Sequence, residues 1–213
     1  MMKHGYFLAG LVFCWIALLF QAPAQSWSER SVKRHKKAIA THRRKLDRAF
    51  SNPTQSPLPA EKIRQFKVLD YFPADFTYLV EATFTTDSTS GPFGMKTTTD
   101  RLPAYRKYGE LKFSLEGRVL KLSVYQNLEL SKKVGYEDYL FIPFTDLTNG
   151  DETYGGGRYI DLRRKELQQK PVRLDFNRAY NPYCAYNKGY SCPIPPAENW
   201  LVVAIRAGVK SPH

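Results

Sequence analysis

The residues most suited to chemistry lie between Asp175 and Asn199, in the stretch DFNRAYNPYCAYNKGYSCPIPPAEN. It contains four tyrosines, four prolines, four asparagines and two cysteines, which suits neither a helix nor an ordinary strand. Its polar side chains could satisfy the backbone of an irregular buried loop, or hydrogen bond a polar ligand on which a tyrosine stacks. Both roles stay open. The candidates are Asp175, Asn177, Tyr180, Asn181, Glu198 and Asn199.

A second unusual stretch, FTDLTNGDETYGGGRYIDL at residues 144–162, contains three successive glycines. Such a run could let a phosphate approach the backbone, but phosphate cradles open into a helix and a strand is predicted here. A hairpin loop with positive-φ positions is therefore favoured, and Tyr154 within it is a further candidate for ligand contact.

Strand parity places two opposite charges on inward faces. Asp146 alternates with the apolar residues of 140–144, and Arg158 alternates with those of 160–162. A buried arginine is costly unless it is paired and hydrogen bonded. We therefore predict an Asp146–Arg158 ion pair, or Arg158 bound to Glu198. A ligand-facing Arg158 is the alternative.

Histidine is absent from residues 60–210, since the histidines after residue 24 are His35, His42 and His213. This excludes a Ser-His-Asp or Cys-His arrangement, and a histidine-ligated metal, within that part of the chain. Cys184 and Cys192 lack the CxxC spacing of structural zinc sites. We predict no metal and no cofactor, and acid–base chemistry only from carboxylates, tyrosine, lysine or arginine.

The elements that position these residues follow from the hydrophobic period. Residues 25–50 predict a basic helix with apolar residues at seven-residue spacing, and residues 51–60 are typical of a proline-punctuated linker. Over residues 61–210 the period changes to two and no long helical pattern appears. The sequence predicts a single, mainly β domain, an antiparallel barrel or sandwich, preceded by the helix.

Alternating apolar and polar residues predict the strands. The clearest is a hairpin over 111–124 with its turn near Glu116 and Gly117. Residues 200–206 are apolar on both faces and predict a central buried strand. The alternation in 172–177 turns Asp175 and Asn177 to one side of their strand. The other predicted strands cover residues 76–84, 139–145 and 158–163.

The amino-terminal residues predict export. A basic start, an apolar run over 6–20 and Ala22-Pro23-Ala24 are typical of a secretory signal covering residues 1–24 and cleaved near Ala24. The run is short for a membrane span, so a retained anchor is the less favoured alternative. A periplasmic or secreted chain lies in an oxidising environment, so Cys184 and Cys192 are predicted to form a disulfide.

The net charge of +12 is concentrated in one segment. Residues 25–50 hold nine Lys and Arg against two acidic residues, whereas residues 51–213 hold 22 basic and 18 acidic residues. Because the chain is predicted to be exported, we predict no nucleic-acid partner. A solvated basic helix is the simpler interpretation, and contact of residues 30–48 with an anionic envelope surface is the alternative.

Three long motifs occur in order: LFIPFTDLTNGDETYGGGRYIDL, LDFNRAYNPYCAYNKGYSCPIPPAEN and LVVAIRAG. Over residues 56–210 the chain resembles the bacterial domain of unknown function 1684 family, in its short, exported form. The usual closing Ala-Gly-Glu-Lys of that family reads Ala207-Gly208-Val209-Lys210 here, which argues against an essential carboxylate at 209. The activity of the family is uncharacterised, so the resemblance implies no mechanism.

Three functional hypotheses follow. The first is an exported domain that binds a small polar ligand or an envelope component at the tyrosine, asparagine and arginine cluster. The second is a histidine-free, hydrolytic enzyme that uses Glu198 or Asp175 as acid or base, with Arg158 holding an anionic group. The third is a purely structural domain. A pocket lined by Tyr154, Arg158, Asn177 and Glu198 would favour the first two, and a fully hydrogen-bonded interior would favour the third.

Overall fold

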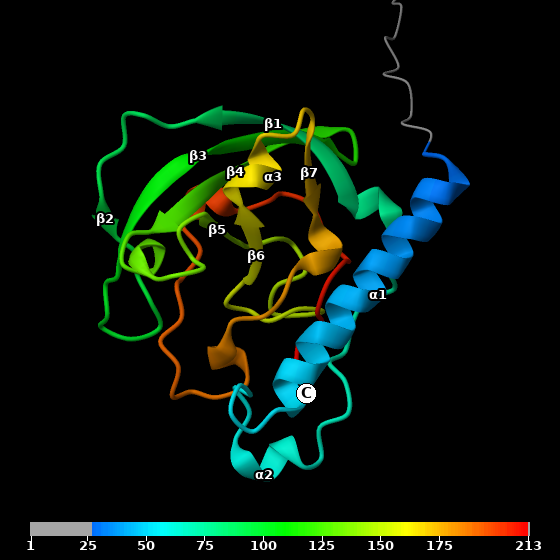
Figure 1. Ribbon diagram of the computed structural model, residues 1–213, viewed down its shortest axis with the longest axis vertical. Helices are drawn as coiled ribbons and strands as arrows, with labels where there is room; N and C mark the ends of the chain where they lie inside the picture. Colours follow the sequence, from blue (N-terminus) through cyan, green and yellow to red (C-terminus); the bar gives the residue numbers. More distant parts are fainter. Residues whose placement is uncertain (1–26, 213) are drawn as a thin grey trace, which may run out of the picture.

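The computed structural model describes residues 27–212 and shows an antiparallel half-barrel sheet flanked by one long helix (Figure 1). The prediction of a mainly β fold preceded by a helix is confirmed, while the predicted signal peptide lies outside the described residues. The sheet runs β6-β5-β4-β3-β1-β7, and β2 pairs with β3. The strands are β1 (Leu79–Thr86), β2 (Phe93–Gly94), β3 (Ala104–Leu115), β4 (Arg118–Asn127), β5 (Tyr139–Phe144), β6 (Arg158–Arg163) and β7 (Val172–Asp175). The helices are α1 (Glu29–Ser51), α2 (Ala60–Ile63) and α3 (Arg164–Leu167), with short 3₁₀ turns η1 (Phe76–Tyr78), η2 (Leu130–Lys132), η3 (Phe176–Arg178), η4 (Tyr183–Ala185) and η5 (Ala197–Asn199).

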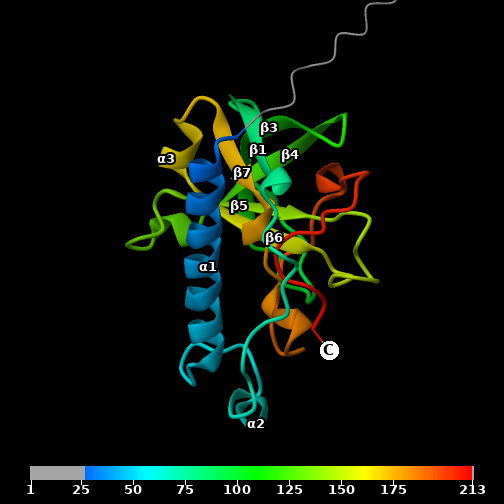
Figure 2. The same cartoon turned by 90° about the vertical axis from the view of Figure 1, so that its right-hand side faces the viewer.

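Helix α1 confirms the helix predicted over 25–50. The side chain of Ser28 caps its first turn by accepting the backbone N–H of Ser31. One side of the helix buries His35, Ile39 and Phe50 against the rest of the chain, and Figure 2 shows α1 running along one side of the half-barrel beside β7. No helix within residues 27–212 is long and apolar enough to cross a bilayer.

The hairpin β3–β4 is the best-predicted part of the sheet. Leu115 pairs with Arg118 across a two-residue turn, at which Glu116 and Gly117 have φ values of 51° and 71°. Two successive positive φ values match the twist of the flanking strands, and a glycine at the second position adopts its value without strain. The predicted turn is therefore confirmed.

The prediction of a central strand over 200–206 is wrong. The segment bends at Val202 and Val203 and forms one bridge, between Trp200 and Thr145, and Val202 is 37 % exposed. Its alternate side chains are buried in the main apolar core, so one face is buried rather than two. These buried residues are Leu201, Val203, Ile205 and Ala207.

Two predicted strands are shorter than expected because an aspartate interrupts each with a 3₁₀ turn. Strand β7 stops at Asp175, whose side chain accepts the N–H of Asn177 at 3.1 Å and starts η3. Asp75 accepts the N–H of Thr77 in the same way and delays the start of β1 to Leu79. Aspartate side chains compete with strand pairing through such local hydrogen bonds.

Candidate functional site

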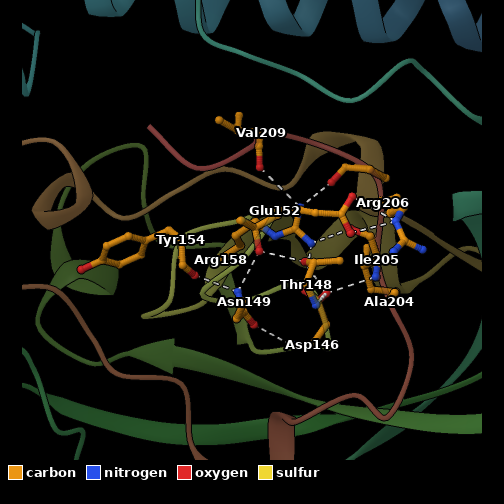
Figure 3. A network of polar contacts seen from close by, with 12 residues as sticks. Asp146, Thr148, Asn149, Glu152, Tyr154, Arg158, Ala204, Ile205, Arg206 and Val209 are labelled. Atoms are coloured by element: carbon orange, nitrogen blue, oxygen red, sulfur yellow. Dashed lines mark hydrogen bonds and ion pairs between the residues drawn. The ribbon is translucent and has the colours of Figure 1, made fainter. Parts of the chain in front are cut away.

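The predicted Asp146–Arg158 ion pair is present and inaccessible (Figure 3). Arg158 Nη2 lies 2.8 Å from Asp146 Oδ2, and both side chains are fully buried. The guanidinium also donates to the carbonyls of Ala207 at 2.5 Å and Ile205 at 2.7 Å. Burial lowers the pKa of Arg158, and Asp146 offsets this effect. Arg158 therefore faces no ligand, and the alternative pairing with Glu198 is wrong.

The Asp146 carboxylate completes the same network. Its Oδ1 accepts the backbone N–H of Thr148 at 2.9 Å and that of Ile205 at 3.1 Å. The two charged side chains thus bond the backbone of Ile205 and Ala207, while Gly208 and Val209 hydrogen bond the backbone of other segments. Together these contacts satisfy the backbone of the segment although it does not join the sheet.

Three predicted candidates hold backbone groups of irregular segments. Asn199 is fully buried, accepts from the N–H of Ser123 at 2.7 Å and donates to the carbonyl of Pro143 at 2.7 Å. Asn177 exchanges two hydrogen bonds with the backbone of Asp75. Asn181 donates to the carbonyl of Lys210 at 2.7 Å. The amides of Asn177 and Asn199 are fully used internally, as expected for a structural role, whereas Oδ1 of Asn181 is buried without a partner among the described residues.

The two carboxylates proposed as acid or base are also occupied. Glu198 is exposed and accepts the hydroxyl of Tyr125 at 2.6 Å. Asp175 is buried, and its Oδ2 lies 2.8 Å from Nε2 of His35 on α1. Asp175 Oδ1 also accepts from Asn177. Asp175 therefore fixes the helix to the sheet, a role that β-domain residues alone did not indicate.

Tyr154 lies beside the two cysteines. Its hydroxyl is 3.8 Å from Sγ of Cys184. Cys184 and Cys192 are both free thiols, and the backbone N–H of Cys184 donates to Sγ of Cys192 at 3.1 Å. The predicted disulfide is not formed in this structure.

The predicted candidates therefore do not converge. Tyr154, Arg158, Asn177 and Glu198 line no common cavity, and each has partners within the fold. Within residues 27–212 no three His, Cys, Asp or Glu side chains are placed to hold a metal ion. Among the eight ligand candidates, Asp175 lines one cavity beside α1, and Tyr180 lines a second cavity that adjoins it.

That cavity is a groove of about 310 Å³ between α1 and β6. We call it the α1–β6 groove. It adjoins a hollow of about 510 Å³ with which it shares four lining residues, His42, Lys45, Glu166 and Arg178. Its full lining consists of His42, Lys45, Leu46, Ala49, Tyr139, Asp161, Leu162, Arg163, Glu166, Arg178 and Tyr180.

Asp161 is the central polar residue of the groove. The hydroxyls of Tyr139 and Tyr180 both donate to its Oδ1, each at 2.7 Å. Burial of these tyrosines and the nearby Asp161 charge raise both tyrosine pKa values well above 10, so the hydroxyls remain donors at neutral pH. No group of the described chain donates to Oδ2. One carboxylate oxygen is fixed, and the other has room for a further partner.

The surrounding protein changes the titration of two groove residues in opposite directions. Desolvation by the protein raises the pKa of Asp161, which lines the groove and is partly buried as a residue. Desolvation, together with the charge of Arg178, lowers the pKa of His42. At neutral pH His42 is therefore a neutral imidazole, which can donate or accept a hydrogen bond.

The remaining charges of the groove come from several elements. Arg163 pairs with Asp138 at 2.6 Å, and Arg178 pairs with Glu166 at 3.2 Å. Lys45, from α1, is exposed and forms no salt bridge with any described residue. An anionic group in the groove would therefore meet Lys45 without breaking an existing pair.

Sequence reasoning missed the groove for an identifiable reason. Asp161 and Tyr139 lie on the faces opposite the buried apolar residues of β6 and β5, and neither was among the predicted candidates. Such residues normally face water, and only α1 turns their surroundings into a cavity. Residues 60–210 contain no histidine, but α1 places His35 beside Asp175 and His42 in the wall of the groove.

The fold and the groove define a mainly β domain whose sheet is covered on one side by a helix, with a polar groove between them. The chain belongs to the family described as "Protein of unknown function (DUF1684)", whose model matches residues 64–210. That segment includes Asp161 and both tyrosines, whereas α1 precedes it.

One solved structure extends this comparison. The chain is 34 % identical to an uncharacterized protein of Haloarcula marismortui, solved by solution NMR, with a TM-score of 0.65. The similarity covers 86 % of this chain and 97 % of that chain. A search of curated proteins found no match.

Proposed function

We propose that this protein binds a small polar ligand in the α1–β6 groove. The observation that carries the proposal is Asp161, a carboxylate kept within the groove at a cost in solvation, with one oxygen held by two tyrosines. Natural proteins retain such groups at functional sites because ligand binding requires a specifically positioned polar atom. Among the asparagine candidates, Oδ1 of Asn181 is the one buried atom without a partner in the described part of the chain, and it carries no charge.

The groove also indicates the chemistry of the ligand. Oδ2 of Asp161 would accept a hydrogen bond from a hydroxyl or amino group. Lys45 would attract a carboxylate or phosphate at the other end, and apolar groups of Leu46 and Ala49 lie between α1 and the sheet. A cavity of about 310 Å³ suits a ligand at the small end of the usual range.

Asp161→Asn is expected to lose the ligand and gain stability. The amide oxygen still accepts from the tyrosines, but the amide nitrogen places a donor where the ligand donates. The pKa of Asp161 is raised in the folded protein. As pH rises above about 4, the Asp161 carboxyl therefore ionises in the unfolded chain before it ionises in the folded one. Ionisation therefore costs the folded state stability above that pH. Asparagine removes this cost, so the variant should melt higher at pH 7 and equally at pH 3.

The titratable groups facing Asp161 contribute to this pH dependence and stay unchanged in the variant. They are Tyr139, Arg163, Arg178 and Tyr180 from the sheet side, and His42 and Lys45 from α1.

Native and denatured mass spectrometry of protein purified from its own host tests the binding. Wild type and Glu198→Gln, a matched tyrosine-bound carboxylate outside the groove, should carry the same extra mass, and Asp161→Asn should not. A bare wild-type protein, or extra mass kept by Asp161→Asn, would contradict the proposal. Lower stability of Asp161→Asn at pH 7 would show that Asp161 has a structural role instead of a ligand-binding role.

We also propose that residues 1–24 are removed near Ala24 during export, and that α1 then contacts an anionic envelope surface. Eight of the nine basic side chains between residues 30 and 48 are exposed, which supports a surface role. The mass of the exported protein reports the cleavage site. An exported protein that retains residues 1–24 would contradict the cleavage.

The triple change of Lys33, Lys36 and Lys37 to glutamine should weaken sedimentation with phosphatidylglycerol vesicles. These side chains are exposed on α1 and lie outside the groove, so ligand binding should persist. Binding should fall steeply with salt, because clustered exposed charges are screened. A control carries the same change at Lys62, Lys67 and Lys133. Equal loss in both triple variants, or equal binding to phosphatidylcholine, would exclude a specific role of α1.

A further inference from the structure

The two thiols form a second cluster, separate from the groove. Cys184 lies in η4, and seven residues separate it from Cys192. The backbone N–H of Cys184 donates to Sγ of Cys192 at 3.1 Å. The loop therefore holds the two cysteines next to each other before any bond forms between them.

The surroundings of the two cysteines differ. Cys192 is 6 % exposed and anchored, because its backbone exchanges hydrogen bonds with Thr98, 94 residues earlier in the chain. Cys184 is only half-buried, in a short 3₁₀ turn that follows Pro182. A reactant from solution can therefore reach Cys184 before it reaches the buried Cys192.

Three donors stabilise a thiolate at Cys184. The Cys192 thiol lowers the pKa of Cys184 to about 6 against the opposing effect of burial, with smaller contributions from the hydroxyls of Tyr154 and Thr98. The same coupling and burial raise the pKa of Cys192. An accessible thiolate beside a protonated second thiol is the arrangement that thiol–disulfide exchange requires.

We propose that Cys184 and Cys192 form a thiol–disulfide exchange site whose substrate is a small, accessible disulfide. Cys184 is the attacking residue and Cys192 is the resolving residue. A structural disulfide would gain nothing from donors aimed at one sulfur. Donors that stabilise the reduced thiolate instead make the disulfide easier to reduce, and so reversible.

The exchange can be written with a substrate RSSR. The Cys184 thiolate attacks one sulfur, forming Cys184–S–S–R and releasing RS⁻, which takes a proton from solvent. Cys192 then loses its proton to solvent and its sulfur attacks Cys184, forming the Cys184–Cys192 disulfide and releasing the second RS⁻. Two electrons pass from the cysteine pair to the substrate, which leaves as two thiols. A dithiol substrate reverses these steps.

The test uses the full chain with Cys14→Ser, reduced and then mixed with glutathione disulfide. Cys192→Ser should trap a mixed disulfide with one glutathione, since the serine hydroxyl can still donate but cannot resolve it. Cys184→Ser should stay unmodified, and the protein with both thiols should lose two hydrogens. These products are read from intact mass, with circular dichroism confirming that each variant is folded.

A pH series of alkylation by iodoacetamide supplies the second measurement. In the protein with both thiols the rate of the first alkylation should reach half its maximum near pH 6, compared with about 8.5 for an unperturbed thiol. Tyr154→Phe should move that midpoint upward, which a merely structural tyrosine would not do. Equal trapping at both cysteines, or a midpoint near 8.5, would overturn the proposal. So would thiols that react only after denaturation.

Discussion

Replacing Arg158 with methionine is expected to lower the free energy of unfolding by about 3–5 kcal/mol. The substitution keeps much of the side-chain volume but leaves Asp146 as a buried charge without its partner. The carbonyls of Ile205 and Ala207 lose their donor as well. Urea denaturation followed by circular dichroism measures the change. A loss as small as that of one ordinary hydrogen bond, about 1 kcal/mol, would contradict the role assigned to this network.

Two further variants separate charge from geometry. Arg206→Gln removes a nearby exposed pair with Glu152, and it should leave the denaturation midpoint nearly unchanged. Arg158→Lys keeps the positive charge near Asp146, but an ammonium cannot reproduce the planar fork that reaches two carbonyls at once. Its stability should fall between those of wild type and Arg158→Met.

Replacing His35 with alanine is expected to cost about 2–3 kcal/mol and to release α1 from the sheet. His35 is buried, contacts Asp175 at 2.8 Å, and packs edge-on against the ring of Phe76 with centroids 4.8 Å apart. Without it the Asp175 carboxylate loses a buried partner. Hydrogen exchange should then speed up selectively along α1, and the α1–β6 groove should lose its ligand because one wall has moved.

The matched control is His42→Ala, on the same helix and directed to the groove. It should weaken ligand binding while α1 remains protected from exchange. If His35→Ala left exchange in α1 unchanged, then Ile39 and Phe50 would be sufficient to hold the helix. In that case the His35–Asp175 contact would not be what docks it.

The sequence predicted those parts of the fold in which local pattern and final environment agree. The β3–β4 hairpin is an example, because its alternation and its turn residues act over neighbouring positions. The Asp146–Arg158 pair was also predictable. Two opposite charges predicted to point into the core from neighbouring segments would each be buried without a partner unless they paired.

The parts that were missed depend on contacts between distant segments. Residues 200–206 have the composition of a strand, yet they form no ladder in the sheet. Asp146 and Arg158 bond the backbone of Ile205, while Leu201 and Val203 bond the backbone that follows β5. The groove depends on α1, which lies more than 100 residues before Asp161 in the chain. Local alternation shows which face a side chain occupies but not what later covers that face.

The way the carboxyl-terminal segment is held also orders events during synthesis. Arg158 leaves the ribosome 47 and 49 residues ahead of Ile205 and Ala207, whose carbonyls complete its hydrogen bonds. Until those residues emerge, the guanidinium and its aspartate are better solvated by water than buried. A nascent chain that ends before Ile205 should therefore remain protease-sensitive around β6, and the core should close only when translation has passed this segment.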